Sequence, residues 1–152
     1  MKHKVTVIDP QILIPQLLEL LEETDAVPLL ISGNSMSPFL IHGRDTVYLS
    51  KITTPPQRGD MILYRRSTGQ YVLHRVYAAG DTFTMVGDAQ TLLEKGFRPE
   101  QMLARVSAVC RKGKLLRKGD FWWNFFETAW LRMLSARPFV HQLYSRFHHT
   151  IK

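Results

Sequence analysis

The middle of the chain, from residue 26 to residue 109, consists of short runs rich in β-branched and aromatic residues. Glycine, proline and aspartate separate these runs, a pattern typical of strands joined by tight turns. We expect strands at Pro28–Ser32, Thr46–Ile52, Met61–Arg66, Gln70–Ala78, Thr82–Val86 and Met102–Val109. Turn chemistry at residues 67–69, 79–81 and 112–114 predicts hairpins, and residues 92–96 are expected to form a loop or one helical turn. The pattern therefore predicts an antiparallel β body.

Helical patterns flank this β body on both sides. Asp9 followed by Pro10 is typical of a helix N-terminus, and apolar residues then recur at helical spacing, which predicts a helix over residues 10–24. From Gly119 onward the spacing is helical again, and Arg137-Pro138 divides this part into two short amphipathic helices. We expect an α+β fold with three parts: an N-terminal helix in residues 1–25, a mainly antiparallel β domain in residues 26–115 and a helical tail in residues 116–152.

Composition excludes several classes of protein. A chain of 152 residues with 45% hydrophobic residues has the make-up of one folded domain. Because Cys110 is the only cysteine, no internal disulfide can form and a cysteine-ligated zinc site is not expected; we expect neither a metal nor a cofactor. No stretch approaches the roughly 20 apolar residues of a transmembrane helix, and no export signal is visible. We therefore expect a cytoplasmic protein, with peripheral association at the inner face of a membrane as an extension of that prediction.

The sharpest local feature is the segment Ser32-Gly33-Asn34-Ser35-Met36, which follows the first expected strand. A glycine two residues before a serine allows a tight turn that presents the hydroxyl and aims nearby N–H groups at one point. This arrangement suits a nucleophilic Ser35, with the oxyanion held by its own N–H together with Asn34 or Ser32. Met36 would either pack under the substrate site or fill the core. The alternative for the whole segment is an ordinary surface turn.

Three further motifs follow the serine in a set order: Arg58-Gly59-Asp60, a strand containing His74-Arg75-Val76, and Gly87-Asp88-Ala89. In this order they resemble the type I signal peptidases and the autocleaving SOS-repressor peptidases, over roughly residues 27–110. The histidine before arginine is similar to the branch found in the endoplasmic reticulum and in archaea, where histidine replaces lysine as the general base. The resemblance implies a signal-peptidase-like fold. Asp88 is the only acid that matches the later box of that branch.

Simple electrostatics also favours His74 as a general base. A lysine must lower its pKa from about 10.4 to near 7, which requires over 4 kcal/mol from its surroundings, whereas histidine begins near 6.5. We expect Ser35 to attack a peptide carbonyl, His74 to take and return the proton, and Asp88 to orient the imidazole. The expected function is a serine endopeptidase that cleaves an extended peptide or leader. The alternatives are an inactive binding module with the same fold and, for His74 alone, an ordinary strand histidine.

The tail differs from the rest of the chain in composition. Residues 116–152 contain all three tryptophans, nine of the sixteen aromatic residues, and six basic against two acidic residues. Such a helical pair suits the water–lipid boundary, so we expect it to replace the amino-terminal membrane anchor of the resembling family. The residues expected to contact a membrane or a partner are Trp122, Trp123, Phe126, Trp130 and Arg132. The alternatives are packing on the β body and dimerisation; nucleic-acid binding is disfavoured because no dense Lys/Arg stripe is present.

Overall fold

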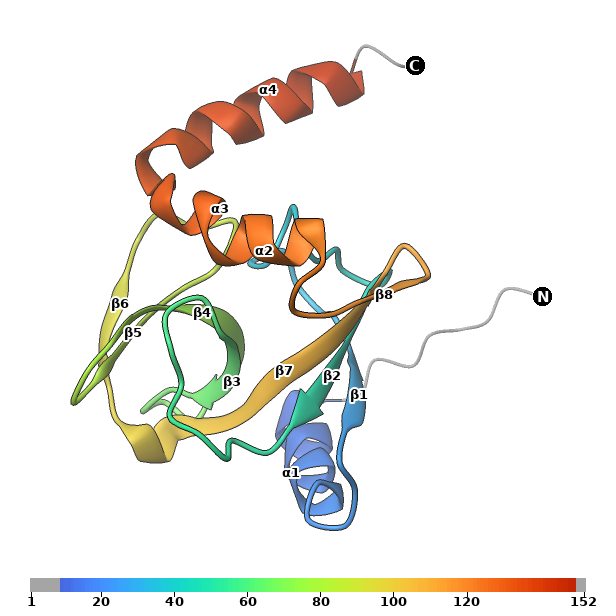
Figure 1. Cartoon of the computed structure of the whole chain (residues 1–152), viewed down its shortest axis with the longest axis vertical. Coiled ribbons are helices and arrows are strands. Elements are labelled where there is room, and N and C mark those ends of the chain that lie inside the picture. The colour runs from blue at the N-terminus through green and yellow to red at the C-terminus, as the bar shows by residue number, and fades with distance from the viewer. Residues whose placement is uncertain (1–8, 150–152) are drawn as a thin grey trace.

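The computed structural model describes residues 9–149 and has an α+β fold around one antiparallel sheet, as the sequence predicts (Figure 1). The strands are β1 (Val27–Leu30), β2 (Thr46–Ser50), β3 (Met61–Arg65), β4 (Tyr71–Ala79), β5 (Phe83–Val86), β6 (Glu94–Phe97), β7 (Met102–Arg111) and β8 (Lys114–Leu116). The helices are α1 (Pro10–Leu20), η1 (Pro99–Gln101), α2 (Phe121–Glu127), α3 (Ala129–Arg132), η2 (Leu134–Ala136) and α4 (Arg137–His149). The strand order is β1-β2-β7-β3-β4-β5-β6, with β8 paired to β7, and the sheet is not closed.

The long strand β7 joins the two halves of the sheet. Its carboxyl-terminal part pairs with β2, from Arg105 to Cys110, and its amino-terminal part pairs with β3, from Met102 to Arg105. Because both pairings contain a register shift, the sheet bends where β7 passes from one neighbour to the other. This bend brings the end of β1 and the beginning of β4 to the same region of the molecule, where both contribute to one pocket.

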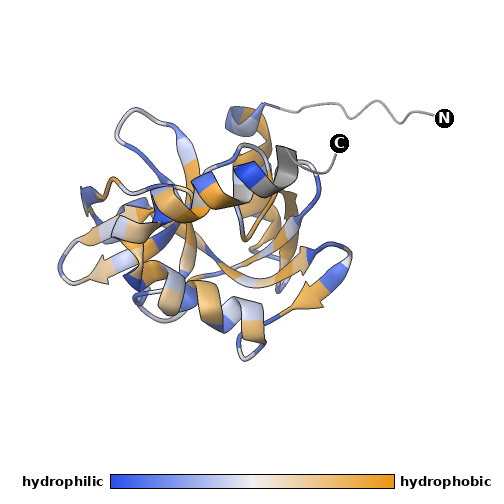
Figure 2. Cartoon of the chain, turned by 90° about the horizontal axis from the view of Figure 1, so that it is seen from above, coloured by the Kyte–Doolittle hydropathy of each residue, from blue (hydrophilic) through white to orange (hydrophobic). Residues whose placement is uncertain are grey.

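Strand β3 separates two hydrophobic clusters. Met61 and Leu63 belong to the larger cluster, which also contains residues of α1, β1, β2, β7, α2 and α3. Ile62 and Tyr64 point to the opposite face and belong to the smaller cluster, with residues of β4, β5 and β7. The period of two along β3 therefore produces core on both faces, and four of its five residues are buried. In Figure 2 the apolar residues concentrate in the strands and helices, while the connecting loops are largely hydrophilic.

Helix α1 begins as the sequence predicts and ends earlier. The Asp9 side chain accepts a hydrogen bond from the backbone N–H of Gln11, which caps the helix. The amide of Gln11 in turn donates to the carbonyl of Gly69, tying the helix to the β3–β4 hairpin. The prediction extended the helix to residue 24, whereas it ends at Leu20. After buried Leu21 the next residues are polar and exposed, so continuing the helix would bury no further apolar surface.

The hairpin at residues 112–113 forms as its sequence indicates, and two strands escaped prediction. Lys112 and Gly113 both have positive φ, 52° and 77°, and connect β7 to β8 across the Arg111–Lys114 pair. Strand β8 was not predicted, and the prediction of a loop or helical turn for residues 92–96 is wrong because Glu94–Phe97 forms the edge strand β6. With its Glu-Lys-Gly-Phe sequence, β6 lacks β-branched residues and is held by pairing with β5.

Helices α2 and α3 fold back against the sheet, which corrects part of the expected membrane surface. Trp123, Phe126 and Trp130 are buried in the larger cluster and cannot contact a bilayer or a partner. Their rings cover Phe39, which stacks on Phe126 at 4.8 Å between centroids and meets Trp123 edge to face. Figure 1 shows α2 and α3 over one end of the sheet, with α4 above them on the side away from the strands. These rings belong to the core because each of them removes a large apolar area from water.

Two of the residues expected at a membrane or partner surface do remain accessible. Trp122 is 46% exposed, and Arg132 at the end of α3 is also exposed. Within residues 9–149, no helix has the length and apolar character needed to cross a membrane.

The burial of the tail rings leads to a stability prediction. Phe126→Ala removes a ring that is 3% exposed, so we expect it to lower the free energy of unfolding by about 3–5 kcal/mol. The matched control Phe121→Ala truncates a ring on the same helix that is 72% exposed, with an expected loss below about 1 kcal/mol. Urea denaturation measures both. Equal effects of the two substitutions would contradict the packing of α2 on the sheet.

Candidate functional site

The loop after β1 places Ser35 between two fixed segments. Gly33 has φ +86°, and its N–H donates to Nδ1 of His42 at 2.9 Å, which fixes the turn before the serine. After the turn, Met36 is buried beneath the loop at 2% exposure. Ser35 itself is half-buried, so its hydroxyl lies at the boundary between the core and solvent.

The turn after β5 supports the Ser35 backbone from the other side. The N–H of Ala89 donates to the carbonyl of Ser35 at 2.9 Å. A Cβ placed on Gly87 would lie 2.5 Å from the same carbonyl oxygen, a distance that real side chains do not reach. Glycine is therefore required at position 87 because the serine loop approaches this turn too closely for any side chain. The Gly87-Asp88-Ala89 turn therefore supports the serine loop through direct backbone contact.

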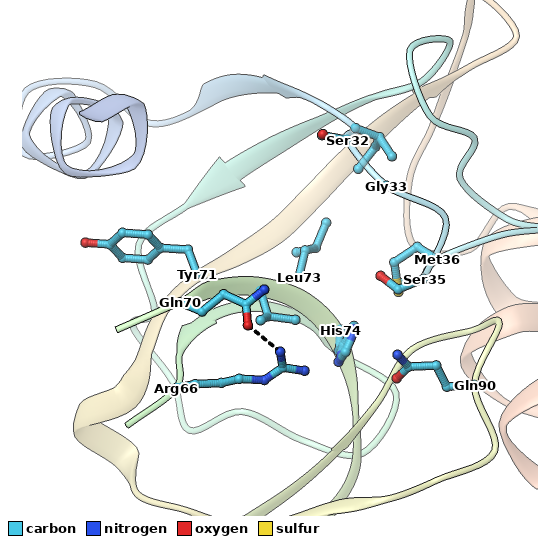
Figure 3. Close-up of a pocket in the computed structure, with 12 residues that line it drawn as sticks. Ser32, Gly33, Ser35, Met36, Arg66, Gln70, Tyr71, Leu73, His74 and Gln90 are labelled. Atoms are coloured by element: carbon cyan, nitrogen blue, oxygen red, sulfur yellow. Dashed lines mark hydrogen bonds between the residues drawn. The ribbon is translucent and has the colours of Figure 1, made fainter. Parts of the chain in front are cut away.

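Ser35 and His74 line the same pocket, a cavity of about 300 Å³ (Figure 3). Ser35 comes from the loop after β1, and His74 comes from the middle of β4, so the two are far apart in sequence. Arg66 and Gln90 also line this cavity, and Figure 3 shows the His74 ring between Ser35 and Arg66. Among the described residues no hydrogen bond joins the Ser35 hydroxyl to the imidazole. The structure thus brings together the two residues that the sequence predicts as nucleophile and base.

Asp88 makes a different contact from the expected one. Both of its carboxylate oxygens accept hydrogen bonds from the Arg75 guanidinium, each at 2.9 Å, and both side chains are buried. Arg75 also donates to the carbonyl of Gly59 at 2.7 Å, so the pair ties strand β4 to the loop at Gly59 and to the turn after β5. Because bidentate pairing with arginine uses both carboxylate oxygens, Asp88 contacts Arg75 instead of His74, the partner that the sequence predicted. Its backbone carbonyl accepts a hydrogen bond from the indole of Trp130 at 2.8 Å.

The imidazole of His74 instead contacts residues that sequence reasoning did not identify. Its Nδ1 lies 2.9 Å from the hydroxyl of Tyr64 on β3 and 3.9 Å from a carboxylate oxygen of Glu94 on β6. The Glu94 carboxylate is held by the Arg66 guanidinium in a two-bond ion pair. No motif marked Glu94, because the segment that carries it was expected to be a loop. Tyr64 appeared only as an apolar strand residue.

Burial governs the protonation of these groups. The pKa of His74 is lowered to about 4, mainly by desolvation; the charge of Arg66 acts in the same direction, while the charges of Glu94 and Asp88 oppose it. His74 is therefore neutral at neutral pH, the form in which imidazole can accept a proton. Since unfolding restores the ordinary value near 6.5, the unfolded chain binds more protons between pH 6.5 and 4, and this group makes the fold less stable as pH falls through that range. Burial also raises the pKa of Tyr64, so its hydroxyl stays protonated.

The expected supporting residues divide into two groups. Ser32 and Met36 line the pocket with Ser35, whereas Asn34 is exposed and is not part of its wall. The carbonyl of Asn34 accepts a hydrogen bond from the N–H of Ser37, an ordinary turn contact. Of the two polar candidates for an oxyanion donor, only Ser32 lines the pocket.

Residues 9–149 contain no cluster of three or more His, Cys, Asp or Glu side chains able to hold a metal ion. Comparison of the chain with models of protein families, with curated proteins and with solved structures found no match.

The burial of His74 generates a spectroscopic prediction. In an NMR titration of the imidazole carbon-bound protons, we expect the His74 signal to titrate with a midpoint near pH 4 because its charged form is desolvated. A His74→Gln sample assigns the signal among the six histidines of the chain. A midpoint at the ordinary value near 6.5 would contradict the burial of the His74 ring described above.

Proposed function

We propose that this protein is a serine endopeptidase in which Ser35 is the nucleophile and His74 the general base. The observation that carries the proposal is that these two side chains, from separate elements, line one pocket, and that the imidazole there is neutral at neutral pH. A nucleophilic hydroxyl beside an unprotonated imidazole is the minimal equipment for acyl transfer. The order of motifs, which resembles that of the signal peptidases, supports the same reaction.

The edges of the sheet favour an extended peptide as substrate. Among residues 9–149, strand β1 pairs only with β2, and the first residues of β4 pair only with β3, because β5 joins β4 from Arg75 onward. The continuation of β1 at residues 31–33 lines the pocket, and so do residue 70 and the first residues of β4, 71–73. Figure 3 shows Ser32 and Gly33 on one side of it and Tyr71 and Leu73 on the other. A peptide strand lying between them would find backbone partners on both sides and pass Ser35.

The proposed reaction proceeds through an acyl-enzyme. The mechanism uses the tautomer in which the Nδ1–H of His74 donates a hydrogen bond to the Tyr64 hydroxyl oxygen, which leaves Nε2 with a free lone pair. Nε2 takes the proton of the Ser35 hydroxyl as the oxygen attacks the peptide carbonyl, and then gives that proton to the departing amine. The backbone N–H of Ser35 and the hydroxyl of Ser32 stabilise the oxyanion of the tetrahedral intermediate. Water then attacks the acyl carbon and gives a proton to Nε2, and the bond to Ser35 Oγ breaks as that oxygen takes the proton back, which releases the acid and restores the enzyme.

Glu94 supplies the carboxylate that the sequence assigned to Asp88. When His74 gains a proton, the nearest acid is Glu94, 3.9 Å from Nδ1 and also paired with Arg66. The charge of Glu94 raises the pKa of His74 more than that of Asp88 does. Tyr64 lies against the same nitrogen and fixes the ring. Asp88 keeps an indirect role, since it holds the strand that carries His74 and the turn that supports Ser35.

Loss of the nucleophile should abolish cleavage. We expect the full-length protein to cut members of a peptide library, read by mass spectrometry, and Ser35→Ala to reduce the rate by at least about a thousandfold. Ser37→Ala is the matched control, because it lies in the same loop but is not part of the pocket wall. Persistent cleavage by Ser35→Ala would exclude this mechanism. Retained peptide binding without cleavage by the native chain would favour the inactive binding module.

Removal of the Glu94 charge should slow the reaction without unfolding the protein. Glu94→Gln leaves the Arg66 cation unpaired near His74, which disfavours the imidazolium, so we expect kcat to fall about tenfold and the acid limb of the pH–rate profile to move to lower pH. The double variant Glu94→Gln/Arg66→Met removes both charges and should restore part of the loss. A pH profile identical to that of the native enzyme would show that Glu94 has no electrostatic role in the reaction.

A further inference from the structure

One surface combines exposed aromatic rings with a segment rich in basic residues. Residues 111–118 contain five basic and no acidic side chains, and they form the β7–β8 hairpin and the link to α2. At the start of α2, Phe121 is 72% exposed and Trp122 is 46% exposed. We use the term basic-aromatic surface for Arg111, Lys112, Lys114, Phe121 and Trp122.

Ring and cation contacts make this surface continuous. The Arg111 guanidinium lies over the Trp122 ring at 5.7 Å, which joins the hairpin to α2. Phe121 and Trp122 meet edge to face with centroids 5.0 Å apart. Trp122 also contacts the buried Phe126, at 6.3 Å between centroids, so the exposed rings are held by the core. These apolar rings are therefore held in place at the surface. Their exposure to water is unfavourable in free energy, and burial against a partner would remove that exposure.

The charge of the hairpin is available to a partner. Within residues 9–149 the side chains of Lys112 and Lys114 take part in no salt bridge, and both residues are exposed. Lys118, by comparison, pairs with Glu127 at 3.4 Å. The hairpin tip thus presents two unneutralised ammonium groups close in the chain to Arg111, whose guanidinium lies over Trp122. Such a combination of cations and exposed rings suits a partner that is both anionic and apolar.

We propose that the basic-aromatic surface docks on an anionic lipid bilayer, with Phe121 and Trp122 entering the headgroup region and the hairpin cations meeting acidic headgroups. Indole and phenyl rings settle at the water–lipid boundary, and basic residues nearby add electrostatic attraction. Stacking of nucleic-acid bases is disfavoured because ring faces are already in use: Arg111 lies over Trp122, and Phe121 stacks on Phe125 with an interplanar angle of 16°. This inference does not depend on the proposed peptidase activity.

The test is binding of the full-length protein to vesicles of phosphatidylcholine with and without phosphatidylglycerol, measured by cosedimentation. We expect binding only when the anionic lipid is present, and weaker binding at raised ionic strength. Lys112→Gln/Lys114→Gln should weaken binding about 30-fold, and Trp122→Ser should weaken it about tenfold or more. Because Trp122 is the exposed tryptophan, brominated lipid should quench the native fluorescence, and Trp122→Phe should remove that quenching.

Matched variants on other parts of the surface test whether the basic-aromatic surface is the one that binds the vesicles. Lys95→Gln/Arg98→Gln removes the same charge at the β6 end of the sheet, and Leu92→Ser changes a side chain that is 80% exposed; both should bind as the native protein does. Phe139→Ser probes α4, where that ring is 64% exposed. The proposal is overturned if anionic vesicles do not bind, if Phe139→Ser abolishes binding while Trp122→Ser leaves it unchanged, or if single-stranded RNA displaces the protein from vesicles through this surface. Circular dichroism verifies that each variant is folded.

Discussion

The arrangement of the site depends on the buried ion pair between Arg75 and Asp88. Through its backbone and its guanidinium, Arg75 connects strand β4 to the loop at Gly59, and Asp88 connects both to the turn that supports Ser35. The carbonyl of Asp88 also accepts a hydrogen bond from the indole N–H of Trp130, which connects the tail to the same turn. Removing one partner of such a pair leaves an uncompensated buried charge and costs about 3–5 kcal/mol. The pair therefore fixes the distance between the serine loop and the strand that carries His74.

The tail contributes a second set of bonds to that turn. Arg137, fully buried at the start of α4, donates to the carbonyls of Gly87, Gln90 and Trp130. The carbonyls of Trp130 and Gly87 also accept backbone N–H groups, from Met133 and Gln90, so Arg137 adds a second hydrogen bond to each of them. Helices α2 and α3 thus complete the core around Phe39 and secure the turn behind Ser35, so the tail is part of the structure that holds the site. Phe121 and Trp122 are among the tail residues that stay accessible, and they carry the proposed contact with a bilayer.

The sequence predicted the elements whose signals are local. Most strands follow from β-branched runs bounded by turn residues, and the α1 N-terminus follows from Asp9 and Pro10. Strand β6 was missed because its sequence has no strand character and its pairing with β5 is a tertiary effect. Ser35 and His74 were identified from motif order, and the structure places both at one pocket.

The contacts of single side chains could not be predicted in the same way. Whether Asp88 pairs with His74 or with the neighbouring Arg75 depends on which groups the folded chain brings within a few ångströms, and only packing decides that. The same limit applies to Glu94, whose position beside His74 follows from the edge strand, and to the tail tryptophans, whose composition suits lipid and core alike.

The most direct test of the central claim is a crystal structure of the protein bound to a peptide boronic acid, which forms a tetrahedral adduct with an active-site serine. The account predicts a covalent bond from boron to Ser35 Oγ, a His74 ring nitrogen within about 2.6–3.2 Å of that adduct, and the peptide extended between β1 and β4. An adduct on another residue, or a His74 ring turned away from Ser35 in the complex, would contradict it.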